Sequence, residues 1–411
     1  MRVGTIQQIV KEHGVKGFCD SYTRALEGKA LANGNTVKLN PYEESFQSLY
    51  EGLVGPVNKS DPIVMEAGLL EPSGFPTVAE KLISTVTIAG YEGRRRVADT
   101  LVPRTYSPKT LTERIPGFTT LTSGKTLVPG EEYPQADFAD KFAGFEEALH
   151  NKKEGVSIDL TEEVVRFDQT NEILMKAEGV GMTIQEERER RTVRALLGIG
   201  LDTGTALSGV YFPSGTDTAL YRAAVNNLRT DATPIFTMAG QPSNSQLWDH
   251  TDFQEILTVH ARNITDDRQT GSGRPISWMP DTVLIPVSLI TIAAQVFNAT
   301  STVVIPSFTA GTNPERRTQG PNPMAQMMSM FGMNSVPMPI ASQYVDEVSA
   351  TNWVVYDRQK SFIRVEIFPF QVFRSPMGYG WKRDVLVSFK AREWSRCIAL
   401  DYRHAIKSDG A

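Results

Sequence analysis

The sequence predicts an α+β protein built around one long helix. Apolar residues recur at helical spacing between Asp159 and Gly200, a span much longer than an ordinary globular helix. A hairpin-like segment precedes it at 111–145, and β-prone runs follow at 362–373 and 384–390. Because long, highly charged helices commonly lie across a domain, we expect this helix to act as a strut.

The length, composition, net charge and cysteine count of the chain exclude several classes of protein. The chain has 411 residues, enough for more than one domain, and its 40% hydrophobic and 22% charged residues are typical of a globular protein. A net charge of −5 disfavours a broad nucleic-acid-coating surface. Two cysteines, Cys19 and Cys397, are too few for a disulfide framework. The most apolar run, 283–299, is too short and too polar for a membrane span and is expected to be buried core.

The first 110 residues contain short helical patterns around Val3–His13 and Glu43–Leu53, and a further one near Thr77–Ile88. Neither of the first two is long enough to bury a core of its own. We therefore expect an extended arm that packs on something else.

An arginine triplet, Arg94, Arg95 and Arg96, lies within this arm. A triple arginine can bind phosphate, but no glycine-rich or aromatic context surrounds this one. Salt bridges to an acidic neighbouring surface are therefore favoured, and the three residues are candidate arm contacts.

Residues 111–145 have the pattern of a protruding β-hairpin. Two short β-prone runs flank Ser123-Gly124, and Pro-Gly pairs punctuate either side. The segment has too little apolar alternation to fill a core, and a two-stranded hairpin alone is marginal in water, so we expect support from another subunit. The candidate inter-subunit contacts here are Phe118, Leu121, Lys125, Leu127 and Glu131.

Sequence signals set the expected limits and shape of the long helix. Asp159 followed by Glu162 has the pattern of an N-terminal capping pair, which places the helix over about 161–198. Gly179 and Gly181 interrupt the apolar stripe. We therefore expect a kink or a second helix start at these glycines.

The middle of this helix, QEERERRT, is charged on every face. Glu186 with Arg190 and Glu187 with Arg191 form acid-before-base pairs four residues apart, the favourable order on a helix. We expect these charges to meet water or a neighbouring chain, and we expect Arg190 and Arg191 to lie near acidic groups of the same or an adjacent chain. The candidate inter-subunit contacts on the helix are Arg188, Arg190, Arg191 and Arg194.

Beyond the helix the pattern is mixed. We expect a loop and then a helix over 210–229, an amphipathic helix over Asp249–Ile264, and a strand at 280–286 followed by a helix over 288–298. Methionines cluster between Met324 and Met338. Methionine suits adaptable contact surfaces, although gap-filling in a loop core is the favoured interpretation.

Enzyme signals are weak. Asp202-Thr203-Gly204 matches the aspartic-protease triplet, but a single copy requires a dimer, and it follows a helix rather than a buried strand. The five histidines are scattered, without metal-ligand spacing. The sequence therefore predicts no catalytic residue, no cofactor and no metal, with a protease using Asp202 as a disfavoured alternative.

Taken in order, these features resemble the major capsid protein of tailed double-stranded DNA bacteriophages. No single motif is diagnostic, but the order covers nearly the whole chain, and encapsulin nanocompartment shells share the fold. The resemblance is carried by SFQSLYEGLVGP (45–56), the hairpin segment (111–145), GVSIDLTEEVVRFDQTNEILMKAEGVG with EERERRTVRALLG (155–198), MPDTVLIPVSLI (279–290) and RDVLVSFKAREWSRCIALDYRHAI (383–406).

This resemblance implies the tailed-phage major capsid fold. Its parts would be an N-terminal arm, an extended β-hairpin called the E-loop, a peripheral (P) domain with a long spine helix and a long-stranded sheet, and a mixed α/β axial (A) domain. The expected ranges are 1–110 for the arm, 111–145 for the E-loop, 146–232 and 383–411 for the P-domain, and 233–382 for the A-domain.

The implied function is structural, with no catalysis. Hexamers and pentamers would tile an icosahedral shell around double-stranded DNA, with the E-loop lying over a neighbour. Scaffolding, portal and decoration proteins are further partners that the resemblance suggests, and the location would be the virion, after assembly in the host cytoplasm, without a membrane. An encapsulin-like shell around a cargo enzyme stays open as an alternative.

Two finer expectations concern processing. Because the sequence begins at Met1, we expect no removal of an N-terminal scaffold segment. Some relatives cross-link a lysine of the E-loop to an asparagine of a neighbour. Lys125 is the only lysine near the hairpin tip, and the sequence gives no sign of that chemistry.

Overall fold

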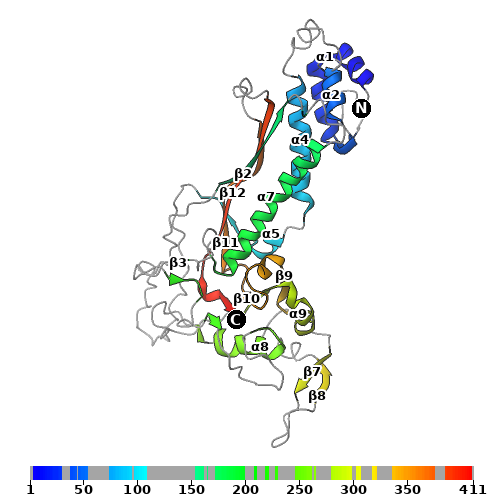
Figure 1. Cartoon of the computed structure of the whole chain (residues 1–411). Coiled ribbons are helices and arrows are strands. Elements are labelled where there is room, and N and C mark those ends of the chain that lie inside the picture. The colour runs from blue at the N-terminus through cyan, green and yellow to red at the C-terminus, as the bar shows by residue number, and fades with distance from the viewer. Residues whose placement is uncertain are drawn as a thin grey trace, which may run out of the picture. The chain divides into compact units, whose positions relative to one another are not determined.

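The structure of the chain is a computed structural model (Figure 1). It describes residues 3–29, 38–43, 45–53, 74–94, 97–108, 153–161, 164, 172–199, 208–210, 218–221, 227–229, 246–261, 263–264, 279–298, 302–306, 317–321, 336–374 and 385–409.

The chain divides into two compact units. Unit 1 comprises Met1–Arg96, Lys153–Glu187 and Phe368–Trp394, and unit 2 comprises Val97–Lys152, Arg188–Ile367 and Ser395–Ala411. The division falls inside one helix and two strands, so each unit is made of segments far apart in the sequence.

Unit 1 gathers its helices around one apolar cluster. Helices α1 (Val3–Leu26), α2 (Phe46–Leu53) and α4 (Gly74–Gly93) lie close together (Figure 1), with the short η1 (Pro41–Glu43) beside α4. The first part of α7 (Glu172–Leu196) adds its apolar stripe. The cluster includes Ile6, Phe18, Tyr22, Phe46, Leu49, Phe75, Val78, Leu82, Val86, Ile173, Leu174 and Ala177.

All three helices predicted in the first 110 residues are confirmed, and two are longer than predicted. Helix α1 continues to Leu26 through a break at Gly14, whose φ of 74° favours glycine. The first two segments pack on α4 and α7 in one shared core, in accord with the expectation that neither makes a core of its own. Each is too short alone, but together they supply a shared core, which single-segment patterns do not reveal.

The sheet of unit 1 is long-stranded. Strand β2 (Lys153–Thr161) pairs antiparallel with β12 (Val385–Ala399) from Thr161 opposite Val385 to Lys153 opposite Trp394, and β11 (Phe362–Arg374) is the other neighbour of β12 (Figure 1). Asp159 therefore lies in a strand, so its predicted role in a helix cap was wrong; the described helix α7 begins at Glu172. The alternation of Ile158 and Leu160, which face the helices, is the strand signal that was missed.

Helix α7 is continuous through its two glycines, so the predicted kink was wrong. A Cβ at Gly181 would lie 2.1 Å from the Thr87 carbonyl oxygen and 2.7 Å from the Tyr91 amide nitrogen of α4. Across the same contact, a Cβ at Gly90 would lie 2.4 Å from the carbonyl oxygen of Glu178. The glycines allow two helix backbones to touch.

Unit 2 holds a mixed sheet in the order β5-β13-β10-β6-β9. Strand β10 pairs antiparallel with β13 and β6, whereas β6 and β9 are parallel. The predicted strand at 280–286 is confirmed. The strands are β5 (Leu228–Arg229), β6 (Thr282–Ile285), β9 (Met338–Ala341), β10 (Trp353–Tyr356) and β13 (Ala405–Ser408).

Short helices surround this sheet. The amphipathic helix expected over 249–264 is confirmed as α8 (His250–Glu255) with the π-helical turn η3 (Ile256–Ala261), and the helix expected over 288–298 as η4 (Val287–Leu289) with α9 (Ile290–Val296). The other helical elements of unit 2 are α5 (Val97–Leu101), α11 (Gln343–Asp346) and η6 (Tyr402–His404).

Three further strand pairs belong to unit 2. Strand β1 (Thr105–Tyr106) lies parallel to the start of β11. Strands β3 (Ser208–Val210) and β4 (Thr218–Ala219) pair, as do β7 (Thr302–Pro306) and β8 (Arg317–Pro321). The helix expected in the later part of 210–229 was wrong for Thr218–Ala219 and Leu228–Arg229, which form β4 and β5.

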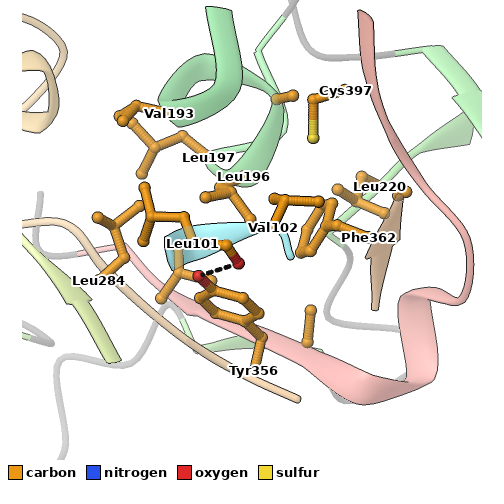
Figure 2. Close-up of a cluster of buried hydrophobic side chains, with 14 of the residues drawn as sticks. Leu101, Val102, Val193, Leu196, Leu197, Leu220, Leu284, Tyr356, Phe362 and Cys397 are labelled. Carbon is orange, nitrogen blue, oxygen red and sulfur yellow. Dashed lines mark hydrogen bonds between the residues drawn. The ribbon is translucent and has the colours of Figure 1, made fainter. Parts of the chain in front are cut away.

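The end of α7 is anchored in the largest core of unit 2 (Figure 2). Val193 and Leu196 of α7, with Leu197 directly after it, meet Leu101 at the end of α5 and the following Val102, together with side chains of the sheet. The Tyr356 hydroxyl donates a hydrogen bond to the Leu101 carbonyl oxygen at 3.0 Å. Cys397, a free thiol, is buried in the same core.

Candidate assembly site

The charged part of α7 is anchored to its own chain by a shared carboxylate. Arg188 donates to Asp99 of α5 at 2.5 Å, and Arg364 of β11 donates to the same oxygen. Arg364 also donates to the Thr105 hydroxyl at 2.9 Å. Arg188 is only 8% exposed, so its charge is satisfied inside unit 2.

The neighbouring residues of the helix also bond inward. Glu189 accepts from the backbone amide of Val97 at 2.9 Å, which satisfies a free N–H at the first turn of α5. Arg191 is 7% exposed and donates to the carbonyl oxygen of Ser395 at 2.9 Å. The expectation that this segment turns all its charges to water or to a neighbouring chain was therefore wrong for Arg188, Glu189 and Arg191.

Arg190 and Arg194 are half-buried and face α11. Arg190 forms a two-pronged ion pair with Glu347 at 3.0 and 3.1 Å, and its guanidinium lies 5.6 Å from the centre of the Tyr344 ring. Arg194 reaches the same carboxylate at 4.0 Å. The prediction that Arg190 lies near an acidic group is confirmed, with Glu347, far along the sequence, as the partner.

The remaining predicted contacts are only partly within the described structure. Arg94 is exposed and forms an ion pair with Glu186, in accord with the salt-bridge interpretation. Arg95 and Arg96 lie outside the described residues, as do the hairpin candidates Phe118, Leu121, Lys125, Leu127 and Glu131 and the triplet Asp202-Thr203-Gly204.

One charged cluster was missed from the sequence. Arg229 of β5 is 1% exposed and donates to Asp252 at 2.9 Å and to Glu255 at 2.7 Å, both on α8. Burial raises the pKa of Asp252, and Arg229 and two backbone amides partly oppose that rise. The signal available was the spacing of Asp249 and Asp252, which form a capping box, but nothing in sequence links them to Arg229.

These interactions are structural in character. Within the residues that the structure describes, no group of three or more His, Cys, Asp or Glu side chains is placed to hold a metal ion. None of the helices described there combines the length and apolarity that a bilayer span requires. The contacts described for this site are ion pairs, hydrogen bonds and a cation–π contact within the chain.

Comparison with known proteins gives the family. The model of a family described as phage capsid protein matches residues 150–408, which is more than half of the chain. The chain belongs to the phage capsid protein family. It is a major capsid protein, a structural component of the virion whose copies assemble into a shell, and the predicted α+β tailed-phage capsid fold is confirmed.

The chain is similar to several solved structures, with low sequence identity and low TM-scores. The capsid of the myovirus phage XM1 is 9% identical, with 76% of this chain and 90% of that chain covered and a TM-score of 0.41. A Mycobacterium phage Bobi structure is 14% identical (77% and 92% covered, TM-score 0.40), and an encapsulin from Synechococcus elongatus is 11% identical (77% and 88%, TM-score 0.40). A search of curated proteins found no match.

Proposed function

We propose that this capsid protein forms hexamers and pentamers that tile an icosahedral shell around double-stranded DNA. The observation that supports this is the family match over 150–408, the part of the sequence expected to form the P-domain and A-domain. A net charge of −5 fits a container that must not adhere to its genome.

Within that shell, residues 1–110 serve as the N-terminal arm and 111–145 as an E-loop that lies over a neighbouring subunit. The P-domain comprises 146–232 and 383–411, and the A-domain 233–382. The hairpin pattern of 111–145, with too few apolar residues for a core, supports the E-loop assignment.

The inter-subunit role proposed for α7 rests on Arg190 and Arg194. Both are half-buried and share Glu347, so each can form a second ion pair with a neighbour. Arg188 and Arg191 are buried within the chain, which leaves little of either side chain for another subunit.

The protein acts without catalysis, and assembly takes place in the host cytoplasm with scaffolding, portal and decoration proteins as further partners. The mildly acidic chain and the lack of metal-ligand spacing among its five histidines support a purely structural role.

The test is electron microscopy of the purified protein, with a nuclease-protection assay for enclosed DNA. Wild-type protein should form closed shells or capsomer rings. Deletion of residues 117–130 should leave soluble subunits or capsomers but no closed shells. The control Thr122→Ser keeps the hairpin length and all the candidate contact residues, and should assemble like the wild type.

Normal shells from the deletion variant would disprove the E-loop assignment. Shells that enclose a cargo enzyme and no DNA would indicate an encapsulin-like compartment instead of a phage head. A protein that stays monomeric in all conditions, with and without a scaffolding protein, would overturn the proposed function.

A further inference from the structure

A long part of unit 2 carries no charge. No Asp, Glu, Lys or Arg occurs between Asp281 and Glu315, or between Arg317 and Asp346. With 22% charged residues overall, an average stretch of this chain would carry a charge about every five residues. Runs of this length are expected where side chains are buried, yet part of this run lies on the surface.

Helix α9 and the preceding η4 have one buried and one exposed side. Leu289, Ala293, Val296 and Phe297 pack into the cluster that contains Phe253, Val283 and Trp353. The opposite side consists of Val287, Ile290, Thr291, Ala294 and Gln295, which are all exposed and which we call the α9 face. Val287 is 45% and Ile290 51% exposed.

The α9 face is held in a fixed position. The carboxylate of Asp346 on α11 accepts from the backbone amides of Val287 at 2.7 Å and Ser288 at 3.3 Å. The Ser288 hydroxyl donates to the carbonyl oxygen of Ala350 at 2.6 Å. An exposed surface that is anchored at its first turn loses little conformational entropy when it binds.

The strand beside this helix also carries exposed residues without charge. Helix α9 lies next to β9 in unit 2 (Figure 1), where Met338 is 45% exposed and Pro339 lacks an N–H. Strand β9 is at the edge of its sheet, and a proline there disfavours extension by an added strand. The proline therefore favours a partner that binds through side chains over one that adds a strand.

We infer that the α9 face is a contact between copies of this protein. Water-facing sides of helices are normally polar and charged, whereas the centres of interfaces are depleted of charge and rich in apolar residues and methionine. This inference rests on the proposed function, because a shell is the setting in which the same chain meets itself repeatedly.

The absence of charge favours a second copy as the partner. Two copies that each carry −5 repel each other where their charged surfaces meet. A charge-free face removes like-charge juxtaposition at the point of contact and needs no complementary charge on the other side. A positively charged partner, including a basic scaffolding segment, would have nothing to pair with here.

The area of the α9 face is more suitable for one of many contacts in a shell than for an isolated dimer. A stable isolated pair buries roughly 800 Å² on each partner, and a helix this short with its preceding turn cannot supply that area alone. The contact is therefore weak by itself and contributes where closure of the shell makes many contacts together.

The test compares two isoleucine-to-glutamate variants in the full chain. Ile290→Glu places a charge in the α9 face, and Ile88→Glu makes the same change on α4, where Ile88 is 42% exposed. Both variants should keep the circular dichroism spectrum and melting temperature of the wild-type subunit. The yield of shells by microscopy and sedimentation should fall at least tenfold for Ile290→Glu, and stay within twofold of the wild type for Ile88→Glu.

A second measurement detects the contact in intact shells. Ala294→Cys carrying a photo-activated maleimide cross-linker should give covalent dimers in assembled particles and none in dissociated subunits. Cys19 and Cys397 are both buried and should not be labelled in the folded subunit.

Suppose that the wild type forms shells. Normal assembly of Ile290→Glu would then overturn the inference, and so would the absence of cross-linked dimers from position 294. Either result would leave the proposed function intact. An equal loss of assembly in both glutamate variants would also overturn it. A wild-type protein that forms no shells would instead refute the proposed function, and the inference with it.

Discussion

The two halves of helix α7 are anchored by different physical means. In the first half, within unit 1, Gly181 lets the helix backbone touch α4. In the second half, within unit 2, Arg188 and Arg191 are buried and bonded to their own chain. The packing of the first half thus depends on glycine, which has no side chain, and that of the second half on arginine, which has a long and charged one.

The difference shows why residue type is a poor guide to exposure on this helix. Glycines predicted a kink because they weaken an isolated helix, but here they remove atoms that would block a neighbour. The arginines predicted a solvent-exposed helix surface. A long arginine side chain can, however, bury its aliphatic part while its guanidinium reaches a carboxylate or carbonyl oxygen on another segment. In both cases the deciding partner is distant in sequence.

The largest expected effect tests the first half. Gly181→Ala places a Cβ against the backbone of Thr87 and Tyr91 and should lower the free energy of unfolding by about 3 kcal/mol. The control Gly179→Ala lies on the same helix with nothing within 4 Å of the added Cβ, and should raise it by about 0.5–1 kcal/mol. Urea denaturation of unassembled subunits measures both.

Opposite signs for the two glycine variants would establish the close helix approach. If Gly181→Ala also stabilised the subunit, the gain in helix propensity would outweigh any steric clash, and the two helices would have room for the methyl group.

The next effect tests the second half. Asp99→Asn removes the charge that Arg188 and Arg364 share, and should destabilise the subunit by about 2–3 kcal/mol because this carboxylate bonds two largely buried guanidinium groups; Arg364 keeps Glu366 at 3.6 Å. The control Glu172→Gln breaks the exposed pair with Lys176 and should leave the free energy of unfolding essentially unchanged. Equal effects in urea melts would mean that burial adds nothing to the Asp99 network.

Local patterns predicted much of the fold. The helix over Asp249–Ile264 and the strand at 280–286 follow from periodicity and from turn residues within the segment itself, and both are present. The existence of α7 was predicted for the same reason. Its predicted N-terminal cap was wrong, because a carboxylate after a β-prone run matches the capping rule whether it starts a helix or, like Asp159, lies in a strand.

Contacts between distant segments were beyond prediction from one sequence. The core of unit 1 joins Ile6, Phe46, Phe75 and Phe389, and no periodicity connects these positions. The pairing of Arg190 with Glu347 was foreseen only as an acidic neighbour of unknown identity. The α9 face was overlooked because an uncharged helix was expected to be wholly buried, and only the structure separates its two sides.

The smallest effect concerns the half-buried pair at the end of α7. Arg190→Glu and Glu347→Arg should each lower the free energy of unfolding by about 0.5–1 kcal/mol, and the double reversal should recover most of that loss because the two-pronged pair can re-form. A double-mutant cycle in urea, followed by microscopy of shells, separates the two roles of Arg190. Recovery of both stability and assembly would mean that Arg190 acts only within its own chain. Recovery of stability without assembly would mean that contact with a neighbouring subunit depends on the sign of its charge, as the inter-subunit proposal requires.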